Sequence, residues 1–492
     1  MNIIYYNPDE MRADMVSCYG NDIIKTPNFD RLAKNGTVFE QCHVQHTVCT
    51  PSRCSFLTGL YPHTNGHRSL WNLLSSHEPN TYLYLKEAGY GVIHTGKNDG
   101  LAEDSYDQCL TEYRTNAHLK PKDEGRHTQY FPEGDLRGPY SFLSGPSYDD
   151  NPGDYYHVQS IIDYIKGRKS DDPRFFAFLA LSYPHCTYVA PEPWYSMYNP
   201  DDLPDLKPMD LPNKPSFMKL IRQYRQLDKI TSYEMKKIMA VYMGMISYSD
   251  HLLGMLLDTL EEEGLMDETA IFAFSDHGDW AGDYGLVEKW PTGLDDDLTH
   301  IPMVVQVPGF KKGHRVKEQV ECFDIMPTTL ELAGVECKHS HFAKSMIPLL
   351  KGGEGDKNRV VMADGGYDLG VDDHCFEGKP TDGLSVNPER PYYPKALQQQ
   401  KNPQSVSRST MIRTLDYKLI RRPNDVDELY DLNKDPAELN NVYDDADYRE
   451  VRLDMIEVML DKMIQTSDTS TRIADNRGWD RNVRISIGKI NH

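Results

Sequence analysis

Two adjacent carboxylates near the start of the chain could hold a metal ion. Asp9 and Glu10 follow the apolar run Ile3–Tyr6, which predicts a first strand. Carboxylate oxygens at the carboxyl end of a strand suit a hard divalent cation. For this segment alone, a turn with solvated acids is the favoured interpretation.

A cysteine stands where a helix is expected to begin. The segment Cys49-Thr50-Pro51-Ser52-Arg53 has a proline and a serine directly after a short linker, which predicts a turn into a helix. The amino end of a helix favours anions, and Arg53 would lie one turn further on. The alternative is that Cys49 is one more small buried side chain.

A second acid lies beside an imidazole. Asp276 and His277 follow the apolar run Ala270–Phe274 and Ser275, so both could face one metal ion. A loop with an incidental histidine is an equally open interpretation. Lys97 and His185 also follow expected strands, although each alone is compatible with a structural or solvated role. Together, a cation and fixed positive side chains would stabilise a dianionic transition state at phosphorus or sulfur.

The elements that must position these residues alternate between short β-rich runs and helical stretches. That order predicts an α/β sheet covered on both faces. Expected strands are 3–6, 91–95, 175–181, 270–274, 302–307, 417–421 and 428–432, and expected helices are 27–35, 82–88, 233–265 and 446–464.

The residue composition of the chain changes after about residue 350. We expect a catalytic domain over residues 1–350 and a C-terminal subdomain over 351–492. Residues 365–405 are rich in Gly, Pro, Asp and Gln and predict a long loop of the kind that lines binding sites. Within it, His374, Arg390 and Lys395 are candidate substrate contacts, with a solvated loop as the alternative.

Composition excludes several classes of protein. The 492 residues carry 53 Lys plus Arg against 75 Asp plus Glu, a net charge of −22, which argues against nucleic-acid binding. No apolar run reaches the 18 or so residues of a membrane helix. The nine cysteines form no Cys-x-x-Cys pair, so neither a disulfide framework nor a zinc site is expected. No signal peptide is visible, which predicts a cytoplasmic protein, or a periplasmic or secreted one if a leader has been removed.

Several motifs together resemble one enzyme family. Cys49-Thr50-Pro51-Ser52-Arg53, followed by Ser55 to Pro62, is similar to the formylglycine motif of the type I sulfatases in the alkaline phosphatase superfamily. The similarity extends over residues 2–443. Its other segments are 9–14, 18–21, 26–33, 96–97, 184–185, 275–278, 283–289, 428–432 and 435–438.

The resemblance implies a fold and an activity. The fold would be alkaline-phosphatase-like, a large mixed, mostly parallel sheet flanked by helices with a smaller C-terminal α+β subdomain. The activity would be removal of O-sulfate from an organic ester, for which a carbohydrate is the expected substrate. A separate maturation enzyme would oxidise Cys49 to formylglycine. One hydroxyl of the hydrated aldehyde, activated by calcium, would attack sulfur, and the second would allow sulfate to be eliminated.

The resemblance also assigns roles by motif position. Asp9, Glu10, Asp276 and His277 would hold calcium together with Cys49.

The remaining matched positions surround the sulfate group. Arg53 would orient the diol, and Lys97 and Lys289 would bind sulfate oxygens. His185, jointly with Lys289, would assist protonation of the leaving group.

Three positions depart from the family pattern. Glu10 stands where many members have Asp, and His277 stands where many have Asn. The histidine that usually follows Lys97 is absent, so the base for the elimination step is open, with Asp99 as a weak candidate because a carboxylate close to sulfate is repelled.

Two other functions stay open. A phosphonate monoester or phosphodiester hydrolase on the same scaffold is compatible with Asp276-His277. A non-catalytic binding protein would result if Cys49 were never oxidised. No nucleic acid or membrane partner is expected.

Overall fold

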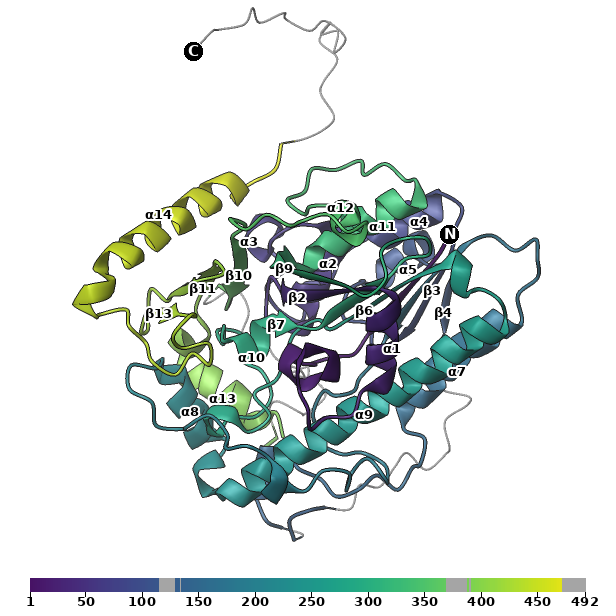
Figure 1. Ribbon diagram of the computed structural model, residues 1–492. Coiled ribbons are helices and arrows are strands. Elements are labelled where there is room, and N and C mark those ends of the chain that lie inside the picture. Colours follow the sequence, from purple (N-terminus) through teal and green to yellow (C-terminus); the bar gives the residue numbers. More distant parts are fainter. Residues whose placement is uncertain (115–128, 133, 369–386, 389–390, 471–492) are drawn as a thin grey trace, which may run out of the picture.

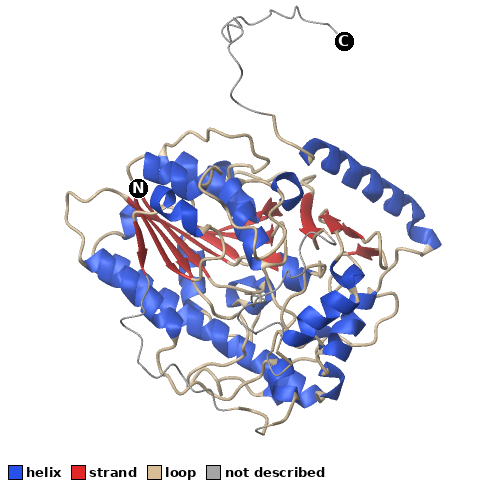
Figure 2. Ribbon diagram, turned by 180° about the vertical axis from the view of Figure 1, so that it is seen from behind, coloured by secondary structure: helices blue, strands red, loops and turns tan. Residues whose placement is uncertain are grey.

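The computed structural model describes residues 1–114, 129–132, 134–368, 387–388 and 391–470, and all structural statements concern these ranges. A large sheet lies at the centre with helices on both faces, and a smaller sheet lies beside it (Figures 1 and 2). Within those ranges no helix combines the length and the apolar character that crossing a bilayer requires.

The large sheet has nine strands in the order β4-β3-β5-β1-β6-β8-β2-β7, with β9 paired to β2. Strands β4, β3, β5, β1 and β6 run parallel, whereas β8 is antiparallel to both β6 and β2. The prediction of a mixed, mostly parallel sheet is therefore confirmed. The strands are β1 (Asn2–Asn7), β2 (Thr37–His43), β3 (Gly91–Gly96), β4 (Glu112–Arg114), β5 (Phe175–Ala180), β6 (Thr269–Phe274), β7 (His300–Ile301), β8 (Met303–Gln306) and β9 (His314–Glu321).

The central strands β1, β5 and β6 are buried at every position because helices cover both faces of the sheet. In β1, Ile4 and Tyr6 belong to one core cluster, while Ile3 and Tyr5 belong to the other. One face is covered by α1 (Pro27–Asn35), α7 (Gly153–Lys166) and α9 (Ser232–Glu262), and the other by α2 (Cys49–Thr58), α4 (Thr81–Glu87) and α11 (Ile325–Ala333). Figure 1 shows these two groups on opposite sides of the strands.

The remaining helices are shorter or lie outside this sandwich. They are α3 (Pro62–Asn65), α5 (Tyr106–Cys109), α6 (Arg137–Ser141), α8 (Ser216–Tyr224), α10 (Asp296–Thr299), α12 (Ile347–Leu350), α13 (Tyr393–Lys401) and α14 (Arg449–Thr466). Helix α4 is capped by Asn80, whose side chain accepts a hydrogen bond from the Leu83 N–H.

The smaller sheet is antiparallel in the order β10-β11-β12-β13. Its strands are β10 (Val361–Gly365), β11 (Ser409–Arg413), β12 (Tyr417–Arg421) and β13 (Glu428–Asp431). The segment expected to be a long loop contains helix α13, because Ala396, Gln398 and Gln399 are buried at helical spacing against the body of the protein.

Four neighbouring parallel strands bring the candidate site together. Strands β3, β5, β1 and β6 end at the same edge of the sheet, and each is followed by a turn that carries candidate residues. Ligand sites in such sheets form outside the carboxyl ends of the strands. Helix α2, which follows β2, begins at this edge with Cys49.

Candidate active site

A group of four ligand-bearing side chains lies at the carboxyl edge of the sheet. Single atoms of Asp9, Cys49, Asp276 and His277 all lie within 4.8 Å of one another, and all four side chains are buried. They come from the turn after β1, the start of α2 and the turn after β6. The sequence prediction that these four residues share one site is consistent with this geometry.

His277 presents one ring nitrogen to this group. Its Nδ1 lies 3.0 Å from the Gly278 carbonyl oxygen, which can only accept, so Nδ1 carries the proton and donates it. The other ring nitrogen, Nε2, faces Sγ of Cys49 at 3.2 Å and Oδ1 of Asp9 at 3.6 Å. A backbone bond of this kind orients an imidazole as a metal ligand.

Arg53 holds the two carboxylates in place. Its Nη2 lies 3.0 Å from Oδ2 of Asp9, and its Nε lies 3.0 Å from Oδ2 of Asp276. The guanidinium is 1% exposed, and its third nitrogen donates to the Lys97 carbonyl. Burial alone would raise the pKa of Asp9, but Lys97 and Arg53 outweigh it and hold that pKa well below its ordinary value.

Cys49 is a neutral thiol in this environment. It is fully buried as the first residue of α2, with Lys97 Nζ 3.5 Å from its sulfur. Burial, reinforced by Asp9, raises the pKa of the thiol well above its ordinary value. Since the thiolate is the nucleophilic form, the unmodified cysteine is a poor nucleophile.

Lys97 reaches the group from the end of β3. Its Nζ lies 2.9 Å from Oδ2 of Asp9 and 3.1 Å from Oδ2 of Asp99. Gly96 makes this approach possible, because its φ is 91° and a Cβ there would lie 1.9 Å from the Ala180 carbonyl oxygen. Asp99 therefore contacts the site through Lys97.

A second cluster forms beside the first. Lys289 Nζ is hydrogen-bonded to Glu10 Oε1 and lies 2.9 Å from Nε2 of His185, whose Nε2 lies 3.6 Å from the same Glu10 oxygen. Burial raises the pKa of Glu10 to about 7, against the opposing effects of His185 and Lys289. Asp154 fixes the turn that carries His185 by accepting hydrogen bonds from the Ser182 and Tyr183 backbone.

The structure thus brings all nine candidate residues to one edge of the sheet but divides them into two clusters. The nine are Asp9, Glu10, Cys49, Arg53, Lys97, His185, Asp276, His277 and Lys289. Glu10 was expected beside the metal with Asp9; its side chain instead lies with His185 and Cys186, and it binds Lys289. The cause is its backbone, whose φ of 67° turns the side chain away from the Asp9 carboxylate.

Of the three candidate substrate contacts in the 365–405 segment, one can be placed. Lys395 lies on α13, is fully buried and pairs with Glu288 at 2.7 Å. His374 and Arg390 lie outside the described residues. Sequence reasoning missed Glu288 and its second partner Arg225, since no motif links positions so far apart.

The donor atoms of the first cluster fit a divalent cation. Two carboxylates are ligands that calcium takes, and a neutral imidazole nitrogen is common with manganese or zinc. Arg53 and Lys97 bind Oδ2 of Asp9, and Arg53 also binds Oδ2 of Asp276. Oδ1 of Asp9 is the oxygen of that carboxylate that faces Cys49.

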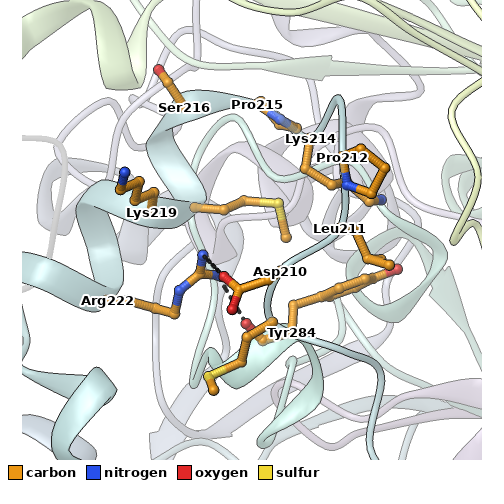
Figure 3. A pocket seen from close by; sticks show the side chains of 11 residues that line it. Asp210, Leu211, Pro212, Lys214, Pro215, Ser216, Lys219, Arg222 and Tyr284 are labelled. Carbon is orange, nitrogen blue, oxygen red and sulfur yellow. Dashed lines mark hydrogen bonds and ion pairs between the residues drawn. The ribbon is translucent and has the colours of Figure 1, made fainter.

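A cavity of about 400 Å³ lies elsewhere, between α8, the loop before it and Tyr284 (Figure 3). Its described lining includes Lys219 and Arg222 but none of the nine candidate residues. This cavity is therefore separate from the candidate active site.

Comparisons with known proteins agree with this geometry. The family model described as Sulfatase matches residues 1–335, and that described as N-sulphoglucosamine sulphohydrolase, C-terminal, matches residues 390–465. The chain is 25% identical to an arylsulfatase of Clostridium perfringens, over 94% of both chains. It is 24% identical to an N-acetylglucosamine-6-O-sulfatase of Bacteroides thetaiotaomicron, over 95% of this chain and 87% of that one.

A solved structure resembles the whole fold. The phosphonate monoester hydrolase of Agrobacterium radiobacter superposes with a TM-score of 0.77 at 22% identity, over 96% of this chain and 97% of that one. At that identity the likeness concerns the fold, and it confirms the alkaline-phosphatase-like architecture. Because the first family model covers more than half of the chain, the protein belongs to the sulfatase family of the alkaline phosphatase superfamily and is a sulfatase, a hydrolase of sulfuric esters.

Proposed function

We propose that this sulfatase removes O-sulfate from a sulfated carbohydrate, using a formylglycine made from Cys49 and a bound calcium ion. The observation that carries the proposal is the position of Cys49. Its sulfur lies 3.2 Å from His277 Nε2, 3.6 Å from Asp9 Oδ1 and 3.5 Å from Lys97 Nζ, so a nucleophile at this atom would meet metal ligands on one side and a cation on the other.

The buried neutral thiol supports a need for oxidation. A thiol whose pKa is raised by burial attacks poorly, whereas a hydrated aldehyde at the same position offers one hydroxyl to attack sulfur and another to release sulfate. We therefore expect a formylglycine-generating maturation enzyme to act on Cys49 before it is buried, since the folded chain leaves it 0% exposed.

Asp9, Asp276 and His277 would hold the calcium ion together with residue 49. When bound, the ion would lower the pKa of a hydroxyl group on residue 49 and neutralise charge that develops on the ester. Arg53 keeps the two carboxylates oriented toward that position.

The two clusters support a division of labour. Lys97, beside Cys49, would bind a sulfate oxygen from the β3 side. Lys289 and His185, whose Nζ and Nε2 are 2.9 Å apart, can pass a proton between them and so deliver it to the departing alcohol oxygen. Glu10 holds Lys289 beside His185 through its contacts with both side chains.

Polar side chains in the lining of a cavity support a carbohydrate substrate. Leu70 packs against Cys49, and its neighbours Ser69 and Asn72 line a cavity of about 190 Å³ together with Arg68 and Asp368. Hydroxyl, amide and charged side chains suit the hydroxyl groups of a sugar. The relative from Bacteroides thetaiotaomicron is named for a sulfated sugar, which supports the same substrate class.

The competing function is hydrolysis of phosphonate monoesters or phosphodiesters, which the fold likeness to the Agrobacterium enzyme favours. The test is the rate of hydrolysis of 4-nitrophenyl sulfate beside bis-4-nitrophenyl phosphate, with wild type and Cys49→Ala, after co-expression with a maturation enzyme. Sulfate cleavage that is faster and is lost in Cys49→Ala supports the proposal. Faster diester cleavage, lost in the same variant, would assign the protein to the competing function.

A further inference from the structure

Glu288 is a buried anion directly before Lys289, and its backbone is fixed. Its N–H donates to Asp279 Oδ1 at 2.8 Å and to the Tyr188 hydroxyl at 2.9 Å, while its carbonyl accepts from Trp280 N–H at 3.3 Å. The side chain is 0% exposed. Its carboxylate therefore cannot move away from Lys289 into solvent.

Three cations surround this carboxylate. Lys395 Nζ lies 2.7 Å from Oε1, and Arg225 Nη1 lies 3.2 Å from Oε2. Lys289 Nζ lies 3.6 Å from Oε1, beyond hydrogen-bonding distance. Lys395 and Arg225 are both fully buried, so solvent does not screen their charges.

We infer that Lys395 is a positioning residue for the reaction, because it occupies the Glu288 oxygen that would otherwise draw Lys289 out of the active site. This inference rests on the proposed function, in which Lys289 binds sulfate and serves the leaving group. Lys395 touches no reacting atom; it acts through Glu288.

Lys395 and Lys289 compete for one oxygen atom, Oε1 of Glu288. A buried carboxylate binds the nearest available cation strongly, since an unpaired charge in the interior is very unfavourable. Among the described cations that pair with Oε1, Lys289 Nζ at 3.6 Å remains when the Lys395 ammonium is removed. Moving that nitrogen toward Glu288 would take it away from His185 Nε2, which is now 2.9 Å away.

Hydrogen bonds just after Lys395 hold this part of the chain against α8 and against the loop that carries Lys289. Lys395 lies on α13, whose C-cap residue Asn402 donates from its side chain to the Tyr224 hydroxyl on α8 at 2.8 Å. Beyond α13, the Ser405 carbonyl accepts from Trp290 Nε1 at 2.7 Å and from Thr292 Oγ1 at 3.0 Å. The segment after β10 is thus fastened to the loop that carries Lys289.

The test compares Lys395→Met with wild type, both with oxidised Cys49. With 4-nitrophenyl sulfate we expect kcat to fall by about 10- to 100-fold, since a displacement of about 1 Å at a catalytic group has effects of this size. KM should change less, and Lys395→Arg should restore most of kcat. The double variant Lys395→Met with Glu288→Gln should recover kcat relative to Lys395→Met alone, because the competing carboxylate is gone.

Lys418→Met is the matched control. Lys418 is equally buried and pairs with carboxylates, at 2.8 Å to Asp296 and 2.7 Å to Glu438, but it lies in β12 of the smaller sheet. It should lower the thermal midpoint without lowering kcat per folded molecule. Equal kcat losses in both variants, or no recovery in the double variant, would overturn the inference.

The position of Lys289, which can be measured without any catalysis, separates this inference from the proposed function. Crystal structures of wild type and Lys395→Met should show Lys289 Nζ moving from 3.6 Å to about 3 Å from Glu288 Oε1. An unmoved Lys289 would contradict the inference even if the enzyme is a sulfatase. A moved Lys289 in a protein that cleaves no sulfate ester would instead contradict the proposed function.

Discussion

The Nε2 atom of His277 faces the sulfur of Cys49 at 3.2 Å because the other ring nitrogen of His277 is held by the Gly278 carbonyl. This relationship joins the turn after β6 to the first residue of α2. It makes residue 49 part of the same group as the proposed metal ligands.

Metal affinity should depend on the first cluster and not on Glu10. Asp276→Asn should weaken calcium binding by more than about 100-fold. Loss of a group that only hydrogen-bonds a metal ligand already lowers metal affinity by about 10- to 100-fold. Glu10→Gln should change it little, because the Glu10 side chain is engaged with Lys289. Titration calorimetry on chelator-treated protein measures both. A large loss of affinity in Glu10→Gln would place Glu10 among the ligands.

Arg53 should matter for stability most when no metal is bound. Arg53→Met leaves Asp9 and Asp276 buried without their cation, which should cost about 3–5 kcal/mol of unfolding free energy in metal-free protein. Calcium should restore part of that loss. Denaturant unfolding with and without calcium measures the difference.

Arg31→Met is the matched control for that experiment, since Arg31 also pairs with two acids, Asp258 and Glu261, but at the surface. It should cost no more than about 1 kcal/mol. Equal losses in the two variants would show that burial of the Arg53 pairs is unimportant.

Removal of His185 should make the rate more sensitive to the leaving group. If His185 and Lys289 protonate the departing oxygen, esters of weakly acidic alcohols need that help most. A plot of log kcat/KM against leaving-group pKa, over a series of substituted phenyl sulfates, should be steeper for His185→Ala than for wild type. Parallel plots would exclude this role.

The ion pair between His67 and Glu78 should give a defined pH dependence of stability. Burial would raise the pKa of Glu78, but hydrogen bonds from His67 and Ser75 lower it to about 2. Burial would lower the pKa of His67, but Cys54 and Glu78 raise it to about 11. The Glu78 contribution is complete above pH 4.5 and is lost as the pH falls toward 2, and the His67 contribution is complete below pH 6.5 and is lost as the pH rises toward 11.

Glu78→Gln should therefore destabilise most between pH 4.5 and 6.5, by about 2 kcal/mol, and progressively less outside that window. Glu87→Gln, which breaks the exposed pair with Lys338, should have an effect below about 1 kcal/mol. Unfolding curves at several pH values decide this. A constant difference across the whole range would contradict the assigned titrations.

Much of the fold could be predicted because its signals are local. The buried strands β1, β5 and β6 are continuous apolar runs, and α9 keeps apolar residues at helical spacing over most of its length. By contrast, α13 forms within a polar segment, because its stability comes from burial against distant elements such as α8. Sequence periodicity carries no information about that contact.

The candidate site could likewise be predicted only in part from the sequence. The motifs identified Asp9, Cys49, Arg53, Asp276 and His277, which the structure indeed brings together. The position of Glu10 depended on a backbone angle, and the role of Lys395 depended on a pair with Glu288 more than 100 residues away. Both are tertiary features that residue type and spacing cannot reveal.

The most direct test of the central claim is the mass of the peptide that contains Cys49, measured on protein made with and without a maturation enzyme, beside its rate of 4-nitrophenyl sulfate hydrolysis. We predict an aldehyde in place of the thiol only after co-expression, with activity proportional to the fraction of aldehyde. Full sulfatase activity from protein whose residue 49 is an unmodified cysteine would contradict the account.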